Sequence, residues 1–172
     1  AVEPVQFNLH TLLNELELRY QRQCHLKGIQ LRIDYRCEDI ELHNDLAKLQ
    51  QILSRLLENA VRYTYQGSIQ LEVKRHGEGS PEQRLGFTLS DTGEGITKNR
   101  LRQLFEINTE DTEQTDNQGL GLLICRKLVE LLNGSIRIES ELGTGTSVYV
   151  SIPLQYRELH LVDMSSEGAA AI

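Results

Sequence analysis

The chain has no long apolar run and no excess of positive charge, and each absence excludes a class of function. No stretch approaches the roughly 18 consecutive apolar residues of a transmembrane helix, and no signal peptide opens the sequence. The 172 residues include 18 Lys and Arg against 25 Asp and Glu, which gives a net charge of −7. A nucleic-acid-binding surface is therefore not expected, and any basic group that matters should face a small anionic ligand.

Cysteines are few and lack the spacing of a zinc or redox site. Cys24, Cys37 and Cys125 are odd in number and far apart in the sequence, so we expect free thiols in a reducing compartment. No internal repeat is present. With 39% hydrophobic residues the chain can bury the core of one domain. The abrupt start at Ala1 and the final EGAAAI suggest a piece of a longer protein.

Periodicity predicts a mixture of helices and strands. We expect helices over residues 9–27, 46–64, 98–105 and 119–132, and strands over residues 29–35, 41–42, 68–76, 85–90, 135–140 and 146–154. The polar stretch 108–118 is expected to be a solvated, mobile loop. Helices and strands do not alternate as strict βαβ units, and the last two strands should form a hairpin. The sequence therefore predicts a two-layer α/β sandwich: a mixed, mostly antiparallel sheet with helices on one face and the other face partly solvated.

The helix over residues 46–64 has a polar residue within a wide apolar stripe. Its apolar positions recur at helical spacing and are Leu46, Leu49, Ile52, Leu53, Leu56, Leu57, Ala60 and Val61. Asn59 lies among them, and an unpaired buried amide costs about 1–3 kcal/mol. Asn59 could be bonded to a neighbouring loop, or it could offer its carbonyl oxygen to Mg²⁺ bound to a nucleotide.

Two glycine-rich segments follow this helix. In the first, DTGEGI over residues 91–96, a carboxylate at a strand end precedes two glycines that let the backbone approach a ligand. In the second, NQGLGL, Gly119 and Gly121 lead into a helix whose free N–H groups and dipole favour phosphate. Each segment alone could be an ordinary turn or a glycine-rich helix start. Their order, with Asn59 upstream, is more specific than either segment.

Together these segments resemble the ATP-binding catalytic domain of sensor histidine kinases, within the superfamily of gyrase, chaperone, histidine kinase and MutL-type ATPases. LLENAVRYT is similar to its Asn box, DTGEGI to its first glycine box, LFEI to the start of its Phe box, NQGLGL to its second glycine box and GTGTSVYVSIPL to its closing hairpin. The opening VEPVQFNLHTLLNEL resembles the segment that follows the dimerisation domain, most often in hybrid kinases. The resemblance implies a Bergerat-type ATP-binding fold over residues 1–155, with 156–172 as a linker or tail.

The resemblance implies a base-binding group of residues. Asp91 would accept a hydrogen bond from the adenine amino group, and Thr146 would help to hold that carboxylate and a water molecule. Gly93 and Gly95 would leave room for the purine, and Ile96 would contact the cofactor.

The resemblance also implies a phosphate-binding group. Asn59 would coordinate Mg²⁺, and Arg62, where the family usually has Lys, would reach a phosphate oxygen. Tyr63 would pack against the base or ribose. The backbone over Gly119, Leu120 and Gly121 would bind the phosphates, and residues 108–118 would form the ATP lid. From the residues alone, Arg62 could equally be a solvated charge and Tyr63 a ring at the edge of the core.

The implied activity is transfer of the γ-phosphoryl group of ATP to a histidine, with Asn59 and Arg62 as the catalytic residues. The acceptor would lie on a separate dimerisation domain, and a response regulator or receiver domain would be a further partner. None of the chain's own histidines has the acceptor context; they are His10, His25, His43, His76 and His160. We therefore expect no autophosphorylation by this chain alone. We also expect no contact with nucleic acid or membrane by these residues. The expected location is the cytoplasm, which includes the cytoplasmic part of an inner-membrane sensor protein.

Two departures from the family pattern leave an alternative open. Arg55 stands four residues before Asn59, where the family usually has Asn and its ATP-hydrolysing members have a general-base Glu. Gyrase-like hydrolysis is therefore not expected, and Arg55 could pair with a phosphate, pair with a lid acid or clash with Mg²⁺. Ile107-Asn108 replaces the usual Pro-Phe of the Phe box. The alternative function is a pseudokinase domain that regulates through protein contacts.

Overall fold

The computed structural model describes residues 1–106 and 117–158, with only the backbone for 104–106 and 117–120. The elements in chain order are β1 (Val5–Asn8), α1 (Leu9–Lys27), β2 (Gln30–Tyr35), β3 (Glu41–Asn44), α2 (Leu46–Tyr63), β4 (Ser68–His76), β5 (Arg84–Asp91), α3 (Lys98–Glu106), α4 (Asn117–Leu131), β6 (Ser135–Glu141) and β7 (Gly145–Pro153). The predicted loop up to position 116 and the predicted tail from 159 onward lie outside the described residues. α4 begins two residues before its predicted start, so both glycines of NQGLGL lie inside the helix.

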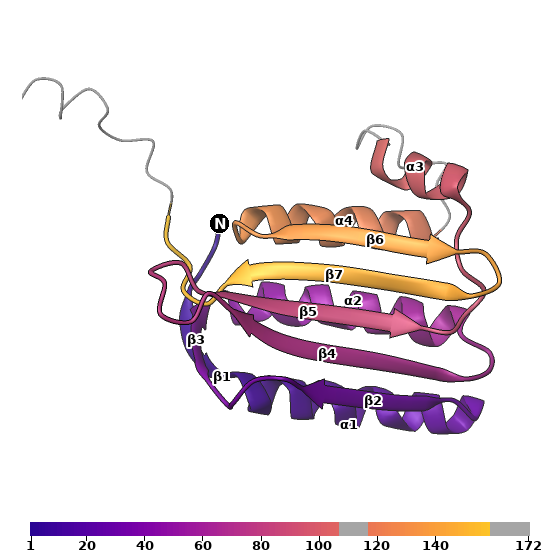
Figure 1. The fold of residues 1–172 in the computed structure, drawn as a ribbon, viewed down its shortest axis with the longest axis horizontal. Helices are drawn as coiled ribbons and strands as arrows, with labels where there is room; N and C mark the ends of the chain where they lie inside the picture. The colour runs from indigo at the N-terminus through magenta and orange to yellow at the C-terminus, as the bar shows by residue number, and fades with distance from the viewer. Residues whose placement is uncertain (107–116, 159–172) are drawn as a thin grey trace, which may run out of the picture.

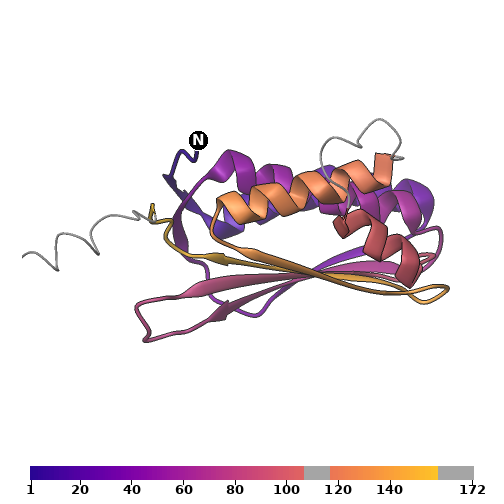
Figure 2. The same ribbon diagram turned by 90° about the horizontal axis from the view of Figure 1, so that it is seen from above.

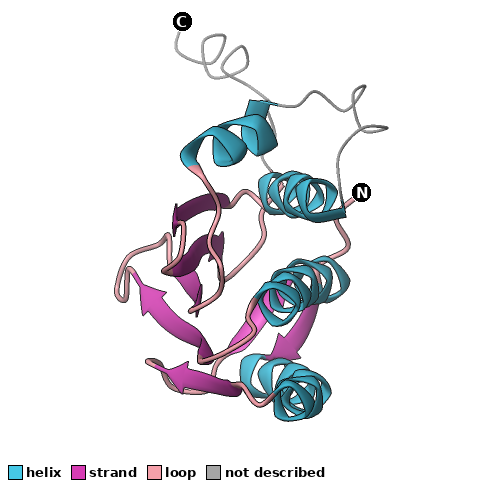
Figure 3. Cartoon of the chain, turned by 90° about the vertical axis from the view of Figure 1, so that its right-hand side faces the viewer, coloured by secondary structure: helices cyan, strands magenta, loops and turns pink. Residues whose placement is uncertain are grey.

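Five strands form one sheet in the order β2-β4-β5-β7-β6 (Figure 1). β2 and β4 are parallel and the other neighbours are antiparallel. Figure 2 shows the helices gathered over one face of this sheet, and Figure 3 shows α1, α2 and α4 side by side when seen end-on. The predicted two-layer sandwich with a mixed, mostly antiparallel sheet is therefore confirmed.

The opposite face of the sheet is more polar. Along β4 the residues Ile69, Leu71 and Val73 are buried, while the side chains between them are half-buried or exposed. This alternation places the apolar set under the helices, as expected for a sheet covered on one side. Within residues 1–106 and 117–158, no helix combines the length and apolarity needed to cross a bilayer.

A second, two-stranded sheet joins parts of the chain that are far apart in sequence. β1 pairs antiparallel with β3. The chain returns to the same place after β7, where His43 N donates to Leu154 O at 3.1 Å and Tyr156 N donates to His43 O at 2.7 Å. The hydrogen-bonded body therefore reaches Tyr156, while the predicted domain boundary after residue 155 stays a prediction.

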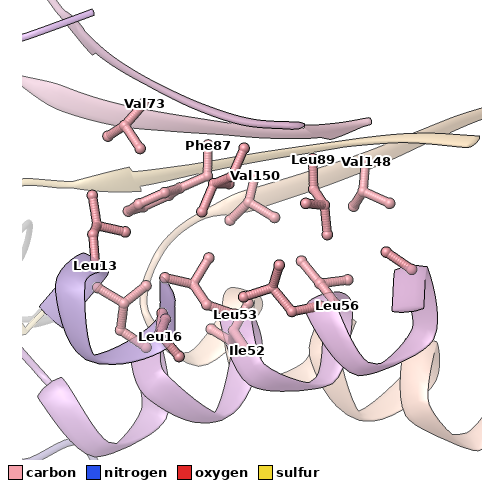
Figure 4. Packing of buried hydrophobic residues seen from close by; sticks show 14 of the residues in the cluster. Leu13, Leu16, Ile52, Leu53, Leu56, Val73, Phe87, Leu89, Val148 and Val150 are labelled. Carbon is pink, nitrogen blue, oxygen red and sulfur yellow. The ribbon is translucent and has the colours of Figure 1, made fainter. Parts of the chain in front are cut away.

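α2 crosses the centre of the sheet and positions the site. The Asp45 side chain caps it by accepting from Lys48 N at 3.0 Å. At its other end, Lys27 Nζ donates to the carbonyls of Val61 and Arg62. The apolar face is buried through Leu49, Ile52, Leu53, Leu56, Leu57, Ala60 and Val61. Figure 4 shows Leu53 and Leu56 beneath Phe87, Leu89 and Val150 of the sheet. Full burial of one such side chain stabilises the fold by about 1.5–3 kcal/mol.

Candidate functional site

A pocket lies between α2, α4, the ends of β5 and β7, and the loop after β5, at the right-hand end of the molecule in Figure 1. Its enclosed cavity is small, about 30 Å³, and its mouth opens to solvent. The lining residues are Leu56, Asn59, Ala60, Tyr63, Leu89, Asp91, Gly95, Ile96, Leu122, Ile138, Thr146 and Val148. An apolar wall with the polar groups of Asn59, Tyr63, Asp91 and Thr146 suits a flat ring that carries a few hydrogen-bonding groups.

Asp91 is the most buried charged group of this pocket. It ends β5 between Ile69 of β4 and Thr146 of β7. Its Oδ1 accepts from Gly93 N at 2.9 Å and from Thr146 N at 3.3 Å, while no described residue donates to Oδ2. Burial raises the pKa of Asp91, and the two N–H groups partly offset this rise. The carboxylate is thus held in place with one oxygen available to a donor on a ligand.

Thr146 holds Asp91 through its backbone rather than its side chain. Its hydroxyl is 2.7 Å from Ser140 Oγ, which donates to Gly145 O at 3.0 Å. Ser140 Oγ also accepts from Ile96 N at 2.7 Å. Ser140 therefore ties the β6–β7 hairpin to the loop that follows Asp91. The sequence analysis missed this residue, because a lone serine on a strand gives no signal of such a contact.

The glycines beside Asp91 are required by close approaches of the chain to itself. A Cβ at Gly95, where φ is +73°, would lie 2.1 Å from Glu141 O. A Cβ at Gly93 would lie 2.5 Å from Tyr63 O and 2.9 Å from Asp91 Oδ1. Three segments distant in sequence can therefore meet around Asp91 only because these positions lack side chains. The predicted room for a purine remains a prediction beside this packing role.

Asn59 and Gly121 face each other across the seam between α2 and α4. Asn59 Nδ2 is buried and has no hydrogen-bond partner in the described part of the chain. A Cβ at Gly121 would lie 3.5 Å from this atom. No described loop residue satisfies Nδ2 of this amide, so the described part of the chain gives the simpler alternative for Asn59 no support. A buried unpaired amide costs about 1–3 kcal/mol, which a ligand could recover.

The remaining predicted residues lie around this pair. Tyr63 lines the pocket, while Arg62 is exposed with its guanidinium 5.7 Å from the centre of the Tyr63 ring. Gly119 and Leu120 fall in the first four residues of α4, whose N–H groups have no acceptor within a helix. Gly121 lies one residue beyond that set, and what the structure shows for it is the approach to Asn59.

Arg55 lies in the same seam, beyond the pocket lining. It is half-buried, its Nε is buried without a partner, and it makes no ion pair with any described residue. The pKa of Cys125 is raised to about 12 by burial, although the positive charge of Arg55 partly offsets this rise. Arg55 thus lies near enough to Cys125 of α4 to act on it electrostatically, and it is not among the residues that line the pocket.

The residues present fit a magnesium ion carried by phosphates. Among the described residues no group of three or more His, Cys, Asp or Glu could hold a metal by itself. Asn59 offers one amide oxygen, and its Nδ2 has no hydrogen-bond partner among the described residues. Mg²⁺ usually takes few protein ligands and completes its shell with water and substrate phosphates, so one amide ligand is compatible with it.

Comparison with known proteins shows which family this chain resembles. Residues 44–156 match the family model of histidine kinase-, DNA gyrase B- and HSP90-like ATPases. The chain is 37% identical over 158 residues to the autoinducer 2 sensor kinase/phosphatase LuxQ of Vibrio vulnificus, covering 88% of this chain and 18% of LuxQ. It is 32% identical over 174 residues to the sensor histidine kinase RcsC of Salmonella typhimurium, covering 98% of this chain and 18% of RcsC.

Solved structures agree. Full-length ShkA in complex with AMPPNP superposes with a TM-score of 0.74 at 27% identity, covering 91% of this chain and 32% of ShkA. The nucleotide-free catalytic domain of histidine kinase ThkA superposes with a TM-score of 0.72 at 25% identity, covering 89% of this chain and 97% of that domain. The chain thus belongs to the histidine kinase-, DNA gyrase B- and HSP90-like ATPases and is, within them, an ATP-binding catalytic domain of the sensor histidine kinase type.

Proposed function

We propose that this chain binds ATP with Mg²⁺ and delivers the γ-phosphoryl group to a histidine on a separate dimerisation domain. The observation that carries the proposal is that Asp91 and Asn59 line one pocket, each with hydrogen-bonding capacity that no described residue uses. The two groups differ in chemistry, since one is an anionic acceptor and the other a neutral amide. A ligand with an amino group at one end and metal-bound phosphates at the other satisfies both.

At the base end, Asp91 selects adenine. Oδ1 is held by two backbone N–H groups, so Oδ2 can accept the exocyclic amino group of adenine without reorganising. Guanine presents a carbonyl oxygen at the corresponding position, and a carboxylate repels it. Ile96, Leu89 and Val148 supply apolar surface to the ring.

At the phosphate end, Asn59 offers Oδ1 to Mg²⁺ and Nδ2 to a phosphate oxygen. The metal neutralises phosphate charge when bound. Gly119 and Leu120 add free N–H groups at the start of α4, where the helix dipole favours anions. Arg62, exposed at the rim beside Tyr63, can reach a phosphate oxygen with two donors.

Phosphoryl transfer asks the protein mainly for positioning and charge neutralisation. The groups above supply both, while the acceptor histidine comes from another domain. The chain spans 18% of LuxQ and of RcsC, both named as sensor kinases, so a histidine-containing domain and a receiver domain are the partners we propose. We propose a cytoplasmic location for this unit.

A second candidate is a pseudokinase domain. The observation that favours it is Arg55, a half-buried side chain whose Nε has no partner among the described residues, one turn from the proposed metal ligand Asn59. A fixed positive charge at that distance disfavours a second cation. The altered Phe box, which also favours this candidate, lies outside the described residues.

The test is a calorimetric titration of ATP with and without Mg²⁺. Wild-type protein should bind adenine nucleotides with a Kd between millimolar and micromolar, and Asp91→Ala should weaken binding by roughly ten- to a hundredfold. Glu139→Gln, a change of an exposed carboxylate on β6, is the matched control and should bind as wild type does. Equal binding by wild type and Asp91→Ala would show that the pocket is wrongly assigned. Transfer of labelled phosphate to a separately prepared dimerisation domain then decides between kinase and pseudokinase.

A further inference from the structure

Thr64 is fully buried, and its hydroxyl has no hydrogen-bond partner among the described residues. The buried polar residues of the described chain are Asn44, Asp45 and Thr64, each at most 3% exposed. Asn44 donates to Pro153 O, and Asp45 accepts from several groups. Thr64 differs, because its backbone N–H closes α2 on Ala60 O at 3.1 Å while its Oγ1 bonds to nothing. The fold's own hydrogen bonds therefore do not explain why this position has a hydroxyl rather than a methyl group.

The hydroxyl and the carboxylate of Asp91 border the same small space above Gly93. A Cβ built on Gly93 would be 3.1 Å from Thr64 Oγ1 and 2.9 Å from Asp91 Oδ1. Both oxygens thus border the small space above Gly93, which stays open because that residue has no side chain. The carbonyl of Tyr63, which also borders the space, already accepts from Glu94 N at 3.3 Å. Among these three oxygens, only the Thr64 hydroxyl can donate a proton.

We propose that Thr64 is a positioning residue of the base-binding site, whose hydroxyl donates to the Asp91 carboxylate when a purine amino group occupies Oδ2. The inference rests on the proposed function of the pocket. Rotation of the Thr64 side chain between staggered states brings the proton toward Asp91 without moving the backbone. The hydrogen bond to a charged acceptor is stronger than one between neutral groups.

The physical need for this bond arises when the ligand closes the pocket. Asp91 then loses its remaining contact with water, which favours the protonated form of the carboxyl. Two backbone N–H groups already support the carboxylate, and a third donor keeps it ionised as an acceptor for the base. Thr64 would thus act through Asp91, without touching the nucleotide.

A purely structural role for Thr64 predicts a different outcome. Its methyl group and β-branch could simply fill the space at the end of α2, and valine would fill it equally well. Removing an unpaired buried hydroxyl should leave the ligand-free protein as stable as before or more stable. The proposal therefore separates two quantities, since stability should hold or rise while nucleotide affinity falls.

The experiment compares Thr64→Val and Thr64→Ser in urea unfolding without ligand and in ATP titrations across a pH series. Thr64→Val should unfold at the same or a higher urea concentration and bind ATP about tenfold more weakly. Its affinity should also begin to fall at a higher pH than that of wild type, because Asp91 loses a donor. Thr64→Ser restores the hydroxyl and should bind within about twofold of wild type. Thr88→Val, the same change on the outer face of β5, controls for loss of a threonine.

Each contrary outcome is decisive. If wild type binds ATP and Thr64→Val binds it equally well with the same pH profile, the inference fails while the proposed function stands. If Thr64→Val does not fold, the fold itself requires the hydroxyl and the inference is again overturned. If wild type binds no adenine nucleotide, the proposed function fails first and the role of Thr64 falls with it.

Discussion

Gly121 of α4 lies directly over the side-chain amide of Asn59 in α2. A Cβ at Gly121 would lie 3.5 Å from Asn59 Nδ2 and 3.8 Å from Oδ1, which is ordinary van der Waals contact. The glycine is therefore not demanded by packing, unlike Gly95. What a side chain here would change is access to an amide that has no partner in the described chain.

Gly121→Ala should stabilise the fold and weaken ligand binding. Alanine in a helix interior is favoured over glycine by about 0.5–1 kcal/mol, and the contact distances leave room for the methyl group. The same methyl covers Asn59, so the affinity for ATP with Mg²⁺ should fall by roughly tenfold. Urea unfolding and calorimetry measure the two effects on one preparation. An affinity equal to that of wild type would mean that the ligand does not approach Asn59.

The raised pKa of Asp91 predicts how both stability and binding depend on pH. Burial is the main cause of the rise, so folding disfavours the ionised form. The resulting loss of folding stability is absent below the unfolded-state pKa and appears as the pH rises through the folded-state pKa. Asp91→Asn should therefore be more stable than wild type at neutral pH, with the difference vanishing in acid. Nucleotide affinity of wild type should begin to fall at a higher pH than an exposed Asp would give. Titrations and unfolding over a pH series test both trends, and a difference in stability that grows in acid would contradict the assignment.

Gly95 and Gly143 offer a matched pair for backbone strain. Both have positive φ, +73° and +83°, but a Cβ at Gly95 meets Glu141 O at 2.1 Å while one at Gly143 meets nothing within 4 Å. Gly143→Ala should cost about 1 kcal/mol of unfolding free energy. Gly95→Ala should cost a further 1–3 kcal/mol or so, because the β6–β7 hairpin must move. Urea unfolding measures both values. Equal losses of unfolding free energy would mean that the β6–β7 hairpin can move aside without cost.

Arg55→Asn tests whether an unpaired charge beside the site restrains the metal. The guanidinium lies one helical turn from Asn59 with no ion-pair partner in the described residues. Removing it should strengthen the dependence of ATP binding on Mg²⁺ several-fold and speed autophosphorylation once the acceptor helices are present. Arg55→Lys keeps the charge and should behave as wild type. If wild type already transfers phosphate fast and Arg55→Asn changes nothing, the pseudokinase alternative loses its main support.

Local patterns were sufficient for the helices and strands. In α2 and in β4 the buried side chains lie on one side of the element, so apolar residues recur in the sequence with the period of a helix or of a strand. The pairing of β1 with β3 was not predictable, because two four-residue strands carry little pattern and their partners lie far apart. The start of α4 was placed two residues late, at Gly119 instead of Asn117, because the polar residues before Gly119 were assigned to the preceding loop.

The candidate site shows the same division. Asp91, Asn59 and the glycines were found from the sequence because each belongs to a short segment of unusual composition. Ser140 and Thr64 were missed, because their importance arises from contacts made across the fold. Arg55 was recognised as unusual, but helical spacing alone did not show that it lies outside the pocket lining.

The sequence by itself determined the fold class, the order of the glycine-rich segments and the residues proposed for the candidate site, since these depend on local composition and period. Only the tertiary structure decided that Asp91 is held by two backbone amides, that Gly121 faces Asn59 and that Arg55 lies outside the pocket lining. The physical reason is that hydrogen bonds and close approaches are set over a few ångströms between residues many positions apart, and packing fixes such distances only when the whole chain has folded.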